Sequence, residues 1–185
     1  MIGGSTRGKG GTYLSRHLSD YKKENDEIYD GSSRGLVEIG IKKQVNELTD
    51  MVNHAKSQKP LYHVHADPSI KLNPEQWGKY WQDFEKEFKL ENQPYAEVYH
   101  VKHGREHVHR VYSLLKSDGN LVRMDKDFQR REKLNRLAEL RHGEEITKGK
   151  HNRAVVETLK SEGKTAEAAA LEASGITQGK RAEAK

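Results

Sequence analysis

Residues 95–115 read YAEVYHVKHGREHVHRVYSLL, and this stretch decides the fold. Apolar and polar side chains alternate on both sides of Gly104-Arg105, as they do in strands with one buried face. We therefore expect a β-hairpin in which Gly104-Arg105 is a two-residue turn. This register predicts three cross-strand pairs: His103 with Glu106, Lys102 with His107, and His100 with His109.

The predicted hairpin gathers histidines on one face. Because side chains alternate along a strand, His107 and His109 share a face, which His100 and Lys102 join from the other strand, while His103 points away. Three neutral imidazoles on two strands leave metal positions open for water or substrate, as a catalytic site requires. The chain has no cysteine, so the ligands suit Mn²⁺, Zn²⁺, Ni²⁺ or Co²⁺. The alternative is a group of surface histidines, but a third histidine opposite the H-x-H pair favours a site.

A second His-x-His pair, His63 and His65, lies in an alternating stretch over residues 61–69, which we expect to be a strand. These two side chains share one face. If that strand neighbours the hairpin, one of them supports the site or contacts its substrate. The other interpretation is that both are half-buried and hydrogen-bonded.

The remaining elements predict an α+β fold. We expect helices over 12–23, 36–56 and 125–141, the last ending at Gly143, and short strands over 26–29 and 120–124. The clearest helix begins with Asn73, Pro74 and Gln76, which form a capping-box-like start. Two sets of apolar residues have helical spacing and predict core: Ile41, Val45, Leu48 and Val52, and then Trp77, Trp81, Phe84 and Phe88.

This order of elements favours a central antiparallel sheet with flanking helices, formed by residues 1–143. The glycine-rich residues 3–11 are expected to be flexible, with glycines that allow close backbone approach to a ligand. Residues 144–185 are rich in Ala, Glu and Lys and predict a polar, helical or disordered C-terminal tail, with weak helices around 154–160 and 166–172.

The composition favours a polyanionic partner. The 185 residues carry a formal charge of +5, and the mean hydropathy of −1.01 excludes a membrane span. Because the first residues also lack the apolar core of a secretory signal, we expect a soluble, cytoplasmic protein without membrane insertion. Five cations are candidates for contact with a phosphate backbone, where they add affinity rather than sequence choice: Arg7, Lys9, Arg16, Lys102 and Arg105.

Three stretches together resemble a known family. HVKHGREHVH, residues 100–109, resembles the three-histidine motif of conjugative relaxases and mobilisation nucleases (MobA/VirD-like, of the HUH endonuclease class). GSTRGKGGTYLSRHL, residues 4–18, resembles their N-terminal motif, and PLYHVHADPS, residues 60–69, occupies the usual place between the two. The resemblance covers about residues 1–143. It departs from the family at His103, where relatives commonly carry an acidic residue that supports a ligand.

The resemblance implies a metal-dependent reaction on DNA. Such an enzyme nicks single-stranded plasmid DNA at the origin of transfer, with possible accessory transfer proteins as partners, and transfers the strand through a covalent 5′-phosphate adduct that leaves a free 3′-OH. The three histidines, His100, His107 and His109, would hold a divalent metal that polarises the scissile phosphate, with Mn²⁺ or Mg²⁺ preferred and Zn²⁺, Ni²⁺ or Co²⁺ as alternatives.

The resemblance leaves three candidates for the attacking side chain. Tyr21 lies about one residue from the place of the family tyrosine, and we favour it over His17, which matches a branch of mobilisation relaxases that uses histidine. Tyr13 lies closer to the glycines. Two other functions stay open: a rolling-circle replication initiator, which shares the histidine motif, and a non-catalytic, DNA-binding plasmid accessory protein on the same fold.

Overall fold

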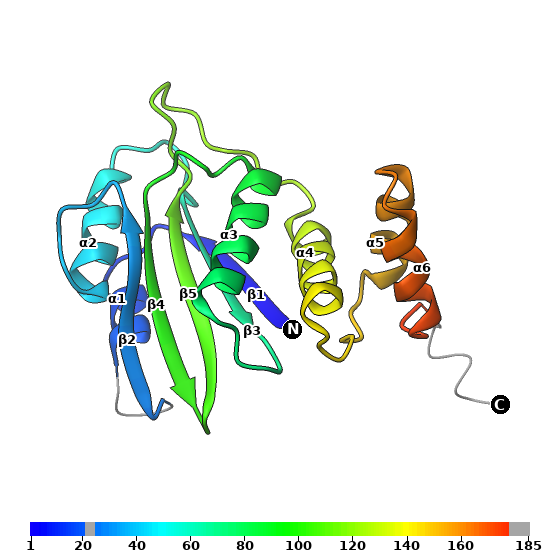
Figure 1. The fold of residues 1–185 in the computed structure, drawn as a ribbon. Helices are drawn as coiled ribbons and strands as arrows, with labels where there is room; N and C mark the ends of the chain where they lie inside the picture. The colour runs from blue at the N-terminus through cyan, green and yellow to red at the C-terminus, as the bar shows by residue number, and fades with distance from the viewer. Residues whose placement is uncertain (21–24, 178–185) are drawn as a thin grey trace.

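A computed structural model describes residues 1–20 and 25–177 of the chain. Five strands form one antiparallel sheet in the order β1-β3-β5-β4-β2, which confirms the predicted α+β fold. Helices α1 and α2 lie on one face of this sheet and α3 and α4 on the other, as Figure 1 shows. The elements run β1 (Ile2–Gly8), α1 (Thr12–Ser19), β2 (Glu27–Arg34), α2 (Ile41–Met51), β3 (Leu61–Asp67), α3 (Pro74–Phe88), β4 (Tyr95–Lys102), β5 (Arg105–Ser113), α4 (Asp127–His142), α5 (Asn152–Ser161) and α6 (Thr165–Ala173).

The two faces of the sheet belong to two separate apolar clusters, because successive side chains of each strand point to opposite faces. In β4, Tyr95 joins the cluster under α3 and α4, while Ala96 and Val98 join the cluster under α1 and α2. Both predicted helical stripes are buried in these clusters. The capping box of Asn73 and Gln76 is also present, so the start of α3 is confirmed.

Helix α2 is shorter than the predicted helix over 36–56. It begins at Ile41, because Gly40 has a φ of 90°, which a helix cannot contain. The preceding loop is instead held by the Glu47 carboxylate, which accepts hydrogen bonds from the backbone N–H groups of Val37 and Glu38.

The prediction of a flexible N-terminus is wrong. Residues Ile2–Gly8 form an edge strand that pairs with β3 along its whole length. Gly4 has to be small, because a Cβ there would lie 2.3 Å from the Cε1 atom of His65. Gly10 is constrained in the same way, because a Cβ there would lie against Thr49 and Leu61.

The hairpin turn lies one residue earlier than predicted. His103 and Gly104 occupy it with φ values of 51° and 73°, the positive values that both central residues of a tight hairpin turn need. The register is therefore Lys102 with Arg105 and His100 with His107, and the predicted pairing of His100 with His109 is wrong. Each pairing shifts by two residues, and since alternation also has a period of two, each side chain within the two strands stays on its predicted face.

Three further boundaries differ. The predicted strand over 120–124 is reduced to one bridge between Leu115 and Leu121. Helix α1 ends at Ser19, and the last residues of the helix predicted over 12–23 lie outside the described part of the chain. The strand predicted over 26–29 extends to Arg34 as β2.

The described part of the C-terminal region is helical. Helices α5 and α6 extend the two weak helices predicted there and share a third apolar cluster with Leu137 and Leu140 of α4. The boundary at residue 143 between a nuclease domain and a tail stays a prediction. Among the described helices, none has the length and apolar content needed to cross a membrane.

Candidate metal centre and nucleic-acid cleft

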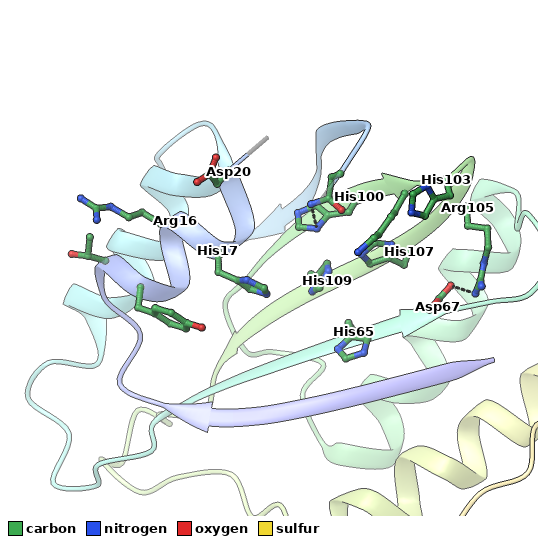
Figure 2. A pocket seen from close by; sticks show the side chains of 14 residues that line it. Arg16, His17, Asp20, His65, Asp67, His100, His103, Arg105, His107 and His109 are labelled. Atoms are coloured by element: carbon green, nitrogen blue, oxygen red, sulfur yellow. Dashed lines mark hydrogen bonds and ion pairs between the residues drawn. The ribbon is translucent and has the colours of Figure 1, made fainter. Parts of the chain in front are cut away.

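The sheet face under α1 and α2 changes character along its length. Near α2 it is apolar, with Leu61, Ala96, Val98 and Val111 in the core. Farther along the same strands, at the positions that alternation places on this face, stand five histidines: His63 and His65 of β3, His107 and His109 of β5, and His100 of β4. Figure 2 shows four of these side chains on the floor of a cleft, with His17 of α1 beside them.

The structure brings His100, His107 and His109 together. Each offers a ring nitrogen that lies within 4.8 Å of the nitrogens of the other two, so the group could hold a metal ion. The ring of His109 is centred 4.5 Å from that of His100 and 5.0 Å from that of His107. His100 and His109 are buried, with 2% and 6% exposure.

Burial keeps these imidazoles uncharged. Loss of hydration, together with the neighbouring histidines, lowers the pKa of His107 to about 4 and holds the pKa of His109 well below its usual value. Burial also lowers the pKa of His100. At neutral pH the rings therefore have free lone pairs, which is the form that binds a divalent cation.

Hydrogen bonds determine which ring nitrogens stay available. The Nε2–H group of His100 donates to the backbone carbonyl of Leu18 at 2.9 Å, so the lone pair of this ring is on Nδ1. The side-chain amide nitrogen of Asn25 lies 3.3 Å from that Nδ1 atom. In His109, Nδ1 lies 2.9 Å from Nε2 of His63. The described residues offer no hydrogen-bond partner to the buried Nε2 of His109.

The triad fits the divalent ion that the sequence predicts. A buried nitrogen without a partner is costly in a folded protein unless a ligand satisfies it. Here the nitrogen belongs to a ring that stands among neutral imidazoles, the ligands that first-row divalent metals prefer in the absence of thiolates.

A cleft of about 840 Å³ opens over the triad. His17 extends into it from α1, with its ring centred 6.3 Å from His109 and 6.2 Å from His63. Tyr13 stacks on the His17 ring at 6.3 Å, but its side chain is 84% exposed. Tyr21, the third candidate for the attacking group, lies outside the described residues.

The predicted phosphate-binding cations are divided between two clefts. Arg16, Lys102 and Arg105 line the cleft over the triad. Arg7 and Lys9 line a second cleft of about 520 Å³ beside β1. The two clefts meet at shared lining residues: Tyr13, His17, His65 and His109.

Some lining residues were missed or misplaced by the sequence analysis. His103 lies in the turn and lines the cleft, so the prediction that it points away is wrong. Asp67 was missed. It pairs with Arg105 at 2.6 Å across the mouth of the cleft. Its position two residues after His65, on the same face of one strand, would have predicted this place.

Comparison with known proteins agrees with this geometry. No curated protein matches the chain. A family model described as "Relaxase: MobA/VirD2-like, nuclease domain" matches residues 13–144, which include α1, the whole histidine face and α4. The chain therefore belongs to the relaxase family and carries its MobA/VirD2-like nuclease domain, a DNA-nicking fold of mobilisation.

Proposed function

We propose that this protein nicks one DNA strand at a plasmid origin of transfer by metal-assisted transesterification and keeps the 5′-phosphate end as a covalent adduct. The observation that carries the proposal is the buried triad, whose unpartnered His109 Nε2 lies under the same cleft that His17 borders. A phosphate group against the triad is thereby within reach of a nucleophile on α1 and of cations on both sides.

His100, His107 and His109 would hold the metal. The resemblance to relaxases, rather than the three imidazoles themselves, favours Mn²⁺ or Mg²⁺ as the ion. When bound, a divalent ion supplies Lewis-acid stabilisation of the charge that develops on the scissile phosphate. Arg16 and Lys102 on one side, and Arg7 and Lys9 on the other, bind the backbone of the single strand.

We propose His17 as the attacking group ahead of Tyr13, and Tyr21, which lies outside the described residues, stays the alternative. Its imidazole borders the triad and both clefts, whereas the Tyr13 ring stacks on the outer side of His17 and is largely exposed. A nitrogen of His17 would form a bond to phosphorus while the bond from phosphorus to the 3′ oxygen breaks. The leaving 3′ oxygen takes up a proton, so the products are a phosphohistidine adduct and a free 3′-OH.

The chemistry of the adduct tests the attacking group. We would incubate the protein with Mn²⁺ and 3′-labelled single-stranded oligonucleotides that span a verified cognate origin, and then separate the products on a denaturing gel. A phosphohistidine link is lost in acid and survives alkali, whereas a phosphotyrosine link survives acid. We expect an acid-labile band that is absent in His17→Ala and in His109→Ala.

His54→Ala is the matched control, because His54 is exposed and lies outside both clefts. It should form the adduct as the wild type does. An acid-stable band that disappears in Tyr21→Phe or Tyr13→Phe would transfer the role to that tyrosine. Metal-dependent binding of the cognate strand without any adduct would instead identify a non-catalytic accessory protein.

A further inference from the structure

We propose that His63 is the hydrogen-bond acceptor that orients His109, holding the ring proton of His109 on Nδ1 and leaving Nε2 for the metal. The inference rests on the proposed metal triad but concerns a residue outside it. Its basis is the 2.9 Å separation between Nε2 of His63 and Nδ1 of His109.

Only one proton can occupy the hydrogen bond between these two rings. If His63 donated it, the proton of neutral His109 would lie on Nε2, where the described residues offer no acceptor. An unsatisfied buried N–H group is destabilising, and the proton on Nε2 would also occupy the lone pair that a metal needs. In the opposite arrangement His109 donates through Nδ1, and its Nε2 lone pair is available to the metal.

The register of β3 against β5 explains why His63 fills this role and His65 does not. His65 is the direct cross-strand partner of His109, and its ring is centred 5.5 Å away. His63 is the diagonal neighbour, and its ring lies nearly coplanar with that of His109, with 5.2 Å between the ring centres and 23° between the planes. Among the hydrogen bonds of the described residues, His109 shares one with His63 through its Nδ1 atom.

The same arrangement occurs at the other buried ligand. His100 donates its Nε2–H to the carbonyl of Leu18, so its proton is also fixed by a protein acceptor. Metal-bound histidines usually donate their second N–H to a carboxylate, a carbonyl or water. In this chain a neutral imidazole, that of His63, takes the place of the carboxylate at His109.

Two substitutions of similar length at His63 distinguish a role as hydrogen-bond acceptor from a role in packing alone. Gln carries an oxygen near the position of the histidine Nε2 atom, and Met carries no comparable acceptor. We expect His63→Met to weaken Co²⁺ binding about 10–100-fold, and His63→Gln to stay within a few-fold of the wild type. The measurement is calorimetric titration of the DNA-free protein with Co²⁺. His54→Met is the control, because His54 is exposed and lies outside both clefts, and it should keep wild-type affinity.

The tautomer of His109 provides a test that needs no metal. Nitrogen-15 NMR of the metal-free wild type should find the His109 proton on Nδ1. A proton on Nε2, or wild-type Co²⁺ affinity in His63→Met, would overturn the inference. If Co²⁺ binding is unchanged in His107→Ala, the metal triad itself is wrong, and the NMR result still decides the role of His63. The same spectrum decides it if His63→Met does not fold.

Discussion

Arg110→Met should strongly destabilise the protein without touching the histidine face. Arg110 lies on β5 between His109 and Val111, which both face α1 and α2, so its side chain points to the α3 side of the sheet. It is 8% exposed and pairs with Glu97 at 2.5 Å and Glu85 at 3.1 Å. Its guanidinium also stacks on Trp81 at 4.4 Å and on Tyr95 at 4.2 Å.

The expected magnitude follows from what the substitution leaves behind. Met replaces the apolar volume but leaves the carboxylate of Glu97, whose side chain is 3% exposed, without its cation. Glu85 keeps its pair with Arg34, which is 34% exposed. Breaking a buried ion pair costs about 3–5 kcal/mol, and the two stacked rings add about 1 kcal/mol. We expect the unfolding free energy to fall by about 4 kcal/mol, a large part of the roughly 5–15 kcal/mol of a typical domain.

Urea unfolding at neutral pH, followed by tryptophan fluorescence, measures this loss. Arg105→Met is the matched control, because the pair of Arg105 with Asp67 is 54% exposed on the arginine side and should contribute below about 1 kcal/mol. Adding Glu97→Gln to Arg110→Met removes the unpaired charge and should recover part of the loss. A loss in Arg110→Met no larger than that in Arg105→Met would refute the reasoning.

Three further predictions test the site and its surroundings. The metal-free protein should lose stability as the pH falls from 6.5 toward 4. The folded pKa values of His63 and His107 are about 3 and 4, so the unfolded chain binds more protons than the folded protein in that window. Equal urea midpoints at neutral pH and about pH 5 would contradict this. Arg16→Gln should weaken single-strand binding and reduce the slope of log affinity against log salt concentration by about 0.7, as measured by fluorescence anisotropy. Lys43 on α2 lies outside both clefts, so Lys43→Gln should change neither the affinity nor the slope. Gly4→Ala should lower the melting temperature, because the new Cβ would collide with His65. Gly78→Ala, in open space within α3, should raise the unfolding free energy by about 0.5–1 kcal/mol and so raise the melting temperature. A shift of the melting temperature in the same direction in both variants would argue against the steric account.

The shared face of His100, His107 and His109 was predictable from sequence although the hairpin register was not. Side chains alternate with a period of two residues along a strand. Pairing His100 with His109 instead of His107 is an error of two residues, so it leaves the triad on one side of the sheet. The turn itself was misplaced because His103 takes a positive φ, which side chains other than glycine rarely do.

Long-range pairing explains what the sequence analysis could not provide. Residues Ile2–Gly8 have a glycine-rich composition that disfavours a strand, and they form one only because β3, distant in sequence, supplies the partner. The contact between His63 and His109 depends on the same adjacency of β3 and β5, which the order of elements leaves open. His17 was a candidate from the resemblance alone, and its position beside His109 needed the packing of α1 on the sheet.

Two successive residues of helix α1 connect the proposed nucleophile with the proposed metal ligands. His17 borders the cleft, and the carbonyl of the next residue, Leu18, accepts the hydrogen bond that fixes His100. The Leu18 side chain is fully buried in the cluster under α1 and α2, so the helix is anchored at this residue. Because the same anchor sets the His17 ring and the His100 tautomer, any shift of α1 relative to the sheet changes the proposed nucleophile and the ligand set together. The apolar cluster under α1 and α2, which holds Leu18, thereby determines how His17 and His100 are placed.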